Sequence, residues 1–139
     1  MPPMSEPGSR REAFGHRGVR IVLIDSITQV VPGDAGAVVV SGSHGGVSSG
    51  HYAAAVHAAL YAFNDAGVGK RRAGIAALDE LAQLGIAAVA VSHETAMIGD
   101  ARDTWEHGVV AHANHPALTG GVRVRDPLSE CAIAAGRAR

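Results

Sequence analysis

The sequence predicts a small α/β domain of two or three layers, in which a leading β-hairpin is followed by mostly parallel strands that alternate with helices. Short runs of aliphatic and β-branched residues, such as 19–24 and 86–91, are typical of buried strands. Alanine-rich segments with apolar residues three or four apart, such as 73–84, are typical of helices. Glycine-rich polar loops separate the two kinds of segment and indicate where one element ends and the next begins.

The chain is expected to start with a flexible tail and then a hairpin. Residues 1–18 contain proline, glycine and arginine but no apolar run, which is typical of a disordered tail. Residues 19–24 and 37–41 predict two strands, and the turn residues 32–36 between them favour a hairpin. The apolar residues within 27–31 suggest that the first strand continues past a short interruption.

After this hairpin the expected elements alternate between helix and strand. A helix is expected from residue 51, and a strand is favoured from about residue 59 because residues 64–70 then become a second strand-to-helix loop. A glycine at position 85 is the expected end of the next helix. The later elements are, in order, a helix over 73–84, a strand over 86–91, a short helix around 104–106, a strand over 109–111 and a last helix that opens at Asp126-Pro127 and runs to about Ala135.

Length and composition bound the class of protein. The 139 residues fit one domain, which we expect over 19–139, and 47% hydrophobic with 18% charged residues is ordinary for a globular protein. A formal charge of −1 gives no electrostatic basis for a nucleic-acid or membrane partner. The one cysteine, Cys131, lies in an apolar run and is expected to be a buried thiol. With no signal peptide or spanning segment, a cytoplasmic location is predicted.

The loop over 41–50 is the strongest functional signal. Three valines run into glycines, serines and one histidine, and a helical pattern follows. A glycine-rich loop at the start of a helix presents unpaired backbone N–H groups at the positive end of the helix dipole, where an anion binds well. A simple helix cap is the alternative interpretation. The expected ligand-binding residues of this loop are Ser43, Gly45, Gly46, Ser48 and Ser49.

The polar segments 41–50, 64–70 and 92–103 each follow a predicted strand. If those strands are parallel neighbours, the segments share the sheet edge where α/β folds bind ligands. His44 is then a candidate general acid or base, with Asp65 or Asp100 to orient it. Lys70 is expected to neutralise substrate charge and Asn64 to bind substrate. The alternative is that each segment is polar only because it is exposed, with Asp103 capping a short helix.

Known catalytic motifs are missing from these segments. The loop 64–70 has Asn64 where a P-loop needs its first glycine and Arg71 where it needs serine or threonine, so P-loop nucleotide hydrolysis is excluded. Eight histidines raise the question of a metal, and His112 and His115 have an i, i+3 spacing. No zinc motif accompanies them, so the sequence leaves the cofactor unknown, with a divalent metal still open, and assigns no metal ligand.

The Gly/Ser loop 42–50, with a hairpin before it and a helix, strand, helix and strand after it, resembles swivelling β/β/α domains. In sequence, residues 36–91 are similar to the small subunit of aconitase-X-type dehydratases. The resemblance implies that Ser48 and Ser49 lie near a substrate, in a site completed by a larger subunit. His44 and the loop 65–70 have no counterpart in that family.

These observations favour a small cytoplasmic enzyme, of lyase, isomerase or hydrolase type, that acts on a small anionic substrate. A short chain seldom encloses a deep pocket alone, so a homo-oligomer is expected. The alternative function is a non-catalytic small subunit or ligand-binding domain that completes a partner's active site. A third hypothesis is a structural oligomer whose glycine loops are only tight turns.

Overall fold

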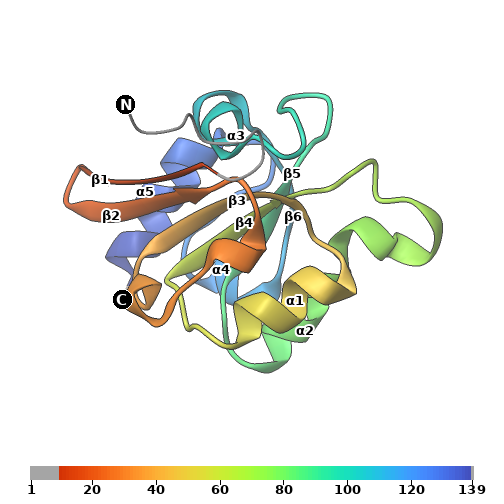
Figure 1. Ribbon diagram of the computed structural model, residues 1–139, viewed down its shortest axis with the longest axis horizontal. Coiled ribbons are helices and arrows are strands. Elements are labelled where there is room, and N and C mark those ends of the chain that lie inside the picture. The colour runs from red at the N-terminus through yellow and green to blue at the C-terminus, as the bar shows by residue number, and fades with distance from the viewer. Residues whose placement is uncertain (1–9, 139) are drawn as a thin grey trace, which may run out of the picture.

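The computed structural model describes residues 10–138, which form a six-stranded sheet with helices on both faces (Figure 1). The strands lie in chain order: β1 (Arg11–His16), β2 (Val19–Ile24), β3 (Val38–His44), β4 (Leu60–Asn64), β5 (Ala88–Val91) and β6 (Val110–Ala113). Strands β2 to β5 run parallel, whereas β1 and β6 pair antiparallel with their neighbours at the two edges. The predicted α/β class, with a leading hairpin and mostly parallel strands, is confirmed.

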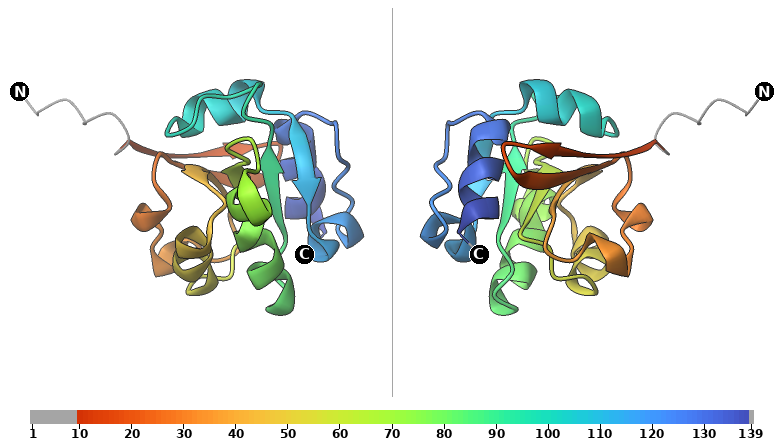
Figure 2. Two further views of the ribbon diagram at one scale, coloured as in Figure 1. Left: turned by 90° about the vertical axis from the view of Figure 1, so that its right-hand side faces the viewer. Right: turned by 90° about the vertical axis from the view of Figure 1, so that its left-hand side faces the viewer.

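The helices divide between the two faces of the sheet. They are α1 (Val47–Ala54), α2 (Ala76–Gln83), α3 (Ala101–His107), α4 (His115–Thr119) and α5 (Leu128–Arg137), with short 3-10 helices η1 (Ile27–Gln29), η2 (Pro32–Asp34) and η3 (Lys70–Ile75). Figure 2 shows α1 and α2 on one side of the sheet and α5 on the other. The domain therefore has three layers. No helix within residues 10–138 combines the length and the apolar character needed to cross a membrane.

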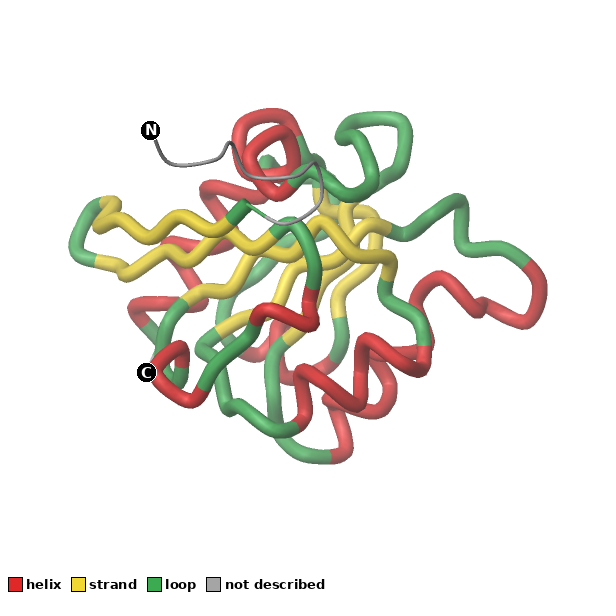
Figure 3. The backbone as a smooth tube through the Cα atoms, in the orientation of Figure 1, coloured by secondary structure: helices red, strands yellow, loops and turns green. Residues whose placement is uncertain are grey.

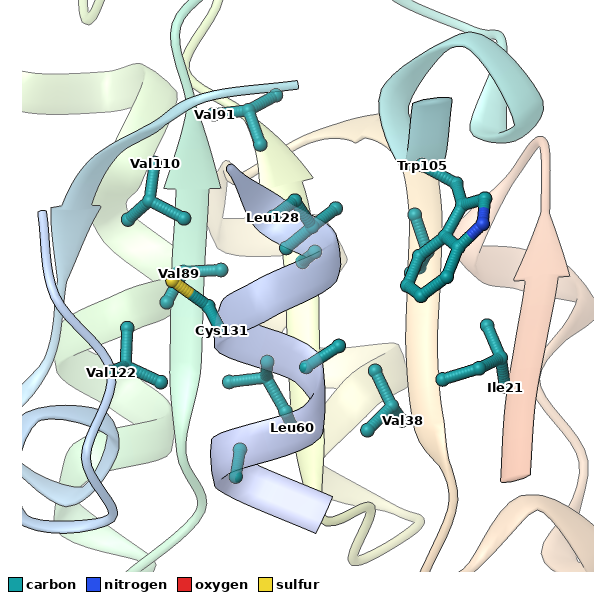
Figure 4. Close-up of a cluster of buried hydrophobic side chains, with 14 of the residues drawn as sticks. Ile21, Val38, Leu60, Val89, Val91, Trp105, Val110, Val122, Leu128 and Cys131 are labelled. Carbon is teal, nitrogen blue, oxygen red and sulfur yellow. The ribbon is translucent and has the colours of Figure 1, made fainter. Parts of the chain in front are cut away.

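Side chains of the parallel strands alternate between two hydrophobic cores, one on each face. In β2, Ile21 and Leu23 belong to the core that contains α5, whereas Val22 and Ile24 belong to the core that contains α1 and α2. Because helices cover both faces, these strands are apolar at almost every position. Figure 4 shows the first core, in which Cys131 of α5 lies over the sheet, and its thiol is buried as predicted.

The leading hairpin consists of β1 and β2 rather than the predicted pair, residues 19–24 and 37–41. Those two segments are β2 and β3, and they pair in parallel because η1 and η2 carry the chain back across the domain. Residues 11–16 form β1 and are not part of a flexible tail; the tail prediction for residues 1–9 lies outside the described residues. Most side chains of β1 are exposed, so this strand lacks the apolar run that would predict it.

Local boundaries also differ from the prediction. Residues 27–29 form η1 instead of extending β2, because the side chain of Ser26 caps a 3-10 turn there. Helix α1 begins at Val47, four residues before the predicted start. Asp100, not Asp103, is the N-cap of α3, and its side chain accepts a hydrogen bond from the Asp103 N–H at 2.9 Å. The predicted strand after residue 59 is confirmed as β4.

Two buried carboxylates hold the segments around β1 in place. Asp25 accepts hydrogen bonds from the Ala101 N–H and from the backbone and guanidinium of Arg10. Asp34 accepts two hydrogen bonds from the Arg11 guanidinium and one from the Val31 N–H. Burial raises the pKa of each carboxyl, but these hydrogen bonds and the arginine charges outweigh it, so both pKa values lie below the ordinary value.

Acid should therefore destabilise the fold. Because the folded pKa of Asp34 is lower than its unfolded pKa of about 3.9, its stabilisation is present above that pH and is lost as the pH falls through the folded pKa. We expect the Asp34→Asn variant to be less stable near neutral pH and to lose less of its remaining stability in acid. Urea unfolding between about pH 7 and pH 3, followed by Trp105 fluorescence, measures both effects.

The matched control for this prediction is Asp79→Asn, which removes an exposed carboxylate on α2. It should leave the pH dependence of unfolding unchanged. If the Asp34→Asn variant loses as much stability in acid as the wild type, the bond between Asp34 and Arg11 does not cause the acid sensitivity.

Candidate functional site

The carboxyl ends of the parallel strands lie along one edge of the sheet. Strands β3, β4 and β5 are parallel neighbours, so the polar segments at their ends begin at the same edge, as the sequence predicts. Three ionisable residues lie at this edge, at the ends of adjacent strands. His44 is the last residue of β3, Asp65 follows β4 and His93 follows β5. This is the edge at which open α/β folds bind their ligands.

Asp65 orients His93. The Oδ1 atom of Asp65 lies 3.1 Å from Nδ1 of His93, and it also accepts the backbone N–H groups of His93 and Gly67 at 3.0 and 2.8 Å. A carboxylate only accepts hydrogen bonds, so this contact favours the tautomer in which Nδ1 of His93 carries the proton and Nε2 is the acceptor. The Asp65 side chain is 7% exposed and that of His93 is 51% exposed. The pair therefore combines a buried, fixed carboxylate with an imidazole that solvent and ligands can reach.

A shallow hollow lies beside His93. It has a volume of about 290 Å³ and is lined by His93, Glu94, Thr95, Ala96, Met97 and Asp103. On another side the ring faces Gly67, where an added Cβ would lie 3.7 Å from the imidazole. The side chain of Asp103 is occupied by the Met97 N–H and by His107, and these bonds lower the pKa of its carboxyl. The hollow gives a small molecule access to the imidazole.

A second histidine approaches the same carboxylate. His112 lies on β6, and its Nε2 is 3.8 Å from Oδ2 of Asp65. The side chain of His112 is 33% exposed. His115, three residues later, instead lies near Thr119 on α4. The i, i+3 spacing of the two histidines therefore does not bring them onto a common partner.

Asn64 is part of the framework of the site. It is fully buried, its amide donates to the Ala96 carbonyl at 3.0 Å, and its side-chain oxygen accepts from the Ala66 N–H at 2.8 Å. Both ends of the side chain are thus engaged within the protein. These bonds give Asn64 a structural role, because they tie the segments after β4 and β5 together; its role in ligand binding stays a prediction.

Lys70 lies on a loop with an unusual backbone. In this segment Ala66, Val68, Arg71 and Arg72 have positive φ, a conformation that is costly for non-glycine residues and most of all for valine. The loop closes on itself, since Gly74 donates its N–H to the Val68 carbonyl. A Cβ at position 74 would also collide with the Asp65 carbonyl oxygen. Figure 3 shows the loop extending from the body at the right-hand side.

The Gly/Ser loop joins the end of β3 to the start of α1. Gly46 is the N-cap of α1 and no side chain caps this end, so the first N–H groups of the helix have no intrahelical acceptor. Ser48 is exposed in the first turn. Ser43 and Ser49 are engaged internally, because Ser43 accepts the Ile27 N–H and Ser49 donates to the His44 carbonyl. Of the predicted serines, Ser48 therefore presents the free hydroxyl.

Gly45 and Gly46 allow close packing at the start of α1. A Cβ on Gly45 would lie 2.9 Å from the Gly74 carbonyl oxygen, and one on Gly46 would lie 2.8 Å from Nε2 of His44. The exposed ring of His44 thus lies against the N-cap of α1. Within residues 10–138, no carboxylate bonds to this ring. His44 thus lies at the helix terminus, and neither Asp65 nor Asp100 bonds to its ring within the residues that the structure describes.

Asp100 acts at the start of α3. Its side chain caps that helix and lies 3.5 Å from the Arg10 guanidinium. Its backbone N–H lies close to Gly42, where an added Cβ would be 2.6 Å away. Asp100 thus belongs to the group of residues around Asp25, not to the His93 group. No hydrogen bond or ion pair joins Asp100 to His44 in the described part of the chain, and the role of Asp100 as its partner stays a prediction.

Two functional candidates were not among the residues that the sequence singled out for catalysis. His93 lies within the polar segment 92–103 and His112 within the i, i+3 histidine pair, and the sequence gives neither of them a catalytic role. Within the described range 10–138, no group of three or more histidine, cysteine or acidic side chains is arranged to hold a metal ion. No protein-family model, curated protein or solved structure matches the chain.

Proposed function

We propose that the chain is an acid–base enzyme that acts on a small anionic molecule at the carboxyl edge of its sheet. The observation that carries this proposal is the hydrogen bond between Nδ1 of His93 and the buried carboxylate of Asp65. An imidazole held in this way has one tautomer and a fixed orientation, which is what a general acid or base needs. The proposal covers proton transfer, a step that lyases, isomerases and hydrolases share.

His93 takes the role that the sequence favours for His44. Asp65 follows β4, which lies between β3, ending at His44, and β5, after which His93 comes. The carboxylate faces the β5 side, where it bonds to the backbone and the ring of His93. His44 instead adds its imidazole to the anion subsite at the start of α1. The proposal thus separates proton transfer at His93 from anion binding at α1.

The anion subsite has three supports. The helix start offers N–H groups without acceptors, Ser48 offers an exposed hydroxyl, and His44 lies against the N-cap. Arg72 and Lys70, both exposed, lie on η3, whose last residues contact the same glycines. Free N–H groups at the start of a helix favour a carboxylate or a phosphate as the bound group.

Binding of inorganic phosphate tests the anion subsite. Saturable shifts of the amide signals of residues 46–49 are expected in two-dimensional NMR spectra, and His44→Gln should weaken binding about two- to tenfold, since a hydrogen bond contributes about 0.5–1.5 kcal/mol. His57→Gln, an exposed histidine between α1 and β4, is the matched control. Equal shifts at the starts of α2 and α5 would show unspecific anion binding and contradict the proposal.

A non-catalytic subunit is the second candidate, and an exposed apolar surface favours it. Val47 and Tyr52 of α1 are 61% and 46% exposed, and Val31 is 44% exposed. Beside them lies a hollow of about 340 Å³ lined by Val30, Pro32, His51, Tyr52, Ala55 and Val56. A second chain, identical or larger, is proposed to cover this surface next to the anion subsite. Sedimentation of the wild type and of Tyr52→Lys tests whether copies associate there.

The compartment proposed for this enzyme is the cytoplasm. The chain has one cysteine in 139 residues, so it forms no internal disulfide, and the Cys131 thiol is buried. Burial also raises the pKa of that thiol, which keeps it protonated and unreactive. A chain of this kind needs no oxidising environment.

A further inference from the structure

The two carboxylate oxygens of Asp65 differ in their hydrogen bonding. Oδ1 accepts three hydrogen bonds, two from backbone N–H groups and one from Nδ1 of His93. Oδ2 has no hydrogen bond within residues 10–138, and Nε2 of His112 lies 3.8 Å from it. The carboxylate therefore lies between two imidazoles, each facing one oxygen.

His112 has no other polar partner in the described part of the chain. Its backbone is held in the sheet, since His112 pairs with Ala90 across β5 and β6. The three residues thus come from three neighbouring positions of the sheet: after β4, after β5 and on β6. The remaining ionisable side chains nearby are Glu94, beside His93 in sequence, and Asp103, across the hollow.

We infer that His112 is a positioning residue for the pair formed by Asp65 and His93. A carboxylate can rotate about its bond to Cβ, and rotation would take Oδ1 away from the line to Nδ1. An imidazole on the Oδ2 side opposes that rotation by attraction, most strongly when it is protonated. His112 thereby keeps the acceptor aligned with Nδ1 of His93 and keeps Nε2 as the atom that exchanges protons with a ligand.

The effect of His112 on catalysis rests on the proposed function, but the test needs no substrate. The measured quantities are the ring nitrogen shifts of His93, which report its tautomer, and the exchange rate of its Nδ1 proton with water. In His112→Leu we expect a mixture of tautomers and roughly tenfold faster exchange of that proton. His112→Gln, which keeps an amide donor near Oδ2, should remain close to the wild type.

Two controls separate this role from a structural one. His115→Leu makes the same replacement at an exposed histidine on α4 and should leave the His93 signals unchanged. The free energy of unfolding of each variant, measured in urea, shows whether the fold is retained; His112 is partly exposed on an edge strand, so the change is expected to be small. If His112→Leu retains one tautomer and the wild-type exchange rate, the inference is wrong.

These measurements keep the two proposals apart. A loss of tautomer order in His112→Leu supports the positioning role even if no reaction is found for the chain. Turnover that disappears in His93→Gln but is unchanged in His112→Leu supports the proposed function and contradicts the positioning role.

Discussion

Replacing His93 by glutamine should lower turnover by about 10²–10⁴-fold, the range typical of a lost general acid or base. The imidazole is the one ring in the described residues that is both bonded to a buried carboxylate and half exposed to a hollow. Phosphate binding at the start of α1 should change little, because His93 lies two strands from β3. The assay is deuterium incorporation from solvent into a panel of phosphorylated and carboxylated metabolites, read by NMR, together with the appearance of products.

Asp65→Asn should have a smaller effect than His93→Gln. The amide oxygen of asparagine still accepts the N–H groups of Gly67 and His93, so the local fold is expected to persist. The negative charge that stabilises a protonated imidazole is lost, and turnover should decrease. His57→Gln and Asp79→Asn are the matched controls and should be fully active. Wild-type turnover in His93→Gln would contradict the proposed role of the imidazole.

Gly42→Ala should cost about 3 kcal/mol or more of the free energy of unfolding. An added Cβ would lie 2.6 Å from backbone atoms of Asp25, Gly99 and Asp100, and none of these can move aside as a side chain could. Gly99 also donates its N–H to the Gly42 carbonyl at 2.6 Å, so the segment before α3 is held directly against β3. A loss of this size is a large fraction of the stability of an ordinary domain.

Gly33→Ala is the control for this substitution. Gly33 lies in η2 without positive φ, and an added Cβ would meet nothing within 4 Å. The free energy of unfolding of Gly33→Ala should therefore remain within about 0.5 kcal/mol of the wild type. Urea unfolding followed by the fluorescence of Trp105, the single tryptophan, compares the variants. Equal stability of Gly42→Ala and Gly33→Ala would show that the segment around Asp100 can move away from β3.

The buried strands could be predicted from the sequence, whereas the edge strand β1 could not. Helices cover both faces of β2 to β5, so the sequence of each of these strands has apolar residues at successive positions, a pattern that predicts a buried strand. Strand β1 packs mainly through Phe14 and His16, whose rings contact Trp105, and its other residues are polar or small. Missing β1 also led to the wrong hairpin, because β2 then lacked its true antiparallel partner.

The candidate site was predicted at the level of segments but not of pairs. The sequence identifies which loops follow strands, and parallel pairing brings those loops to one edge. Which histidine meets Asp65 depends on the direction in which its carboxylate turns between β3 and β5, and no local pattern contains that information. Ser43, Ser49 and Asn64 show the same difficulty, since their side chains hold the backbone together instead of facing a ligand.

The left-handed loop after Asp65 has a consequence for engineering the chain. Each non-glycine residue there carries a conformational cost of about 1–2 kcal/mol, and four such residues together approach the net stability of a small domain. Val68, the β-branched member of the set, carries the highest conformational cost, but its side chain packs against the core that contains α1 and α2. Thermostabilisation of the protein would therefore best begin with glycine at the exposed positions Ala66, Arg71 and Arg72, which belong to neither core.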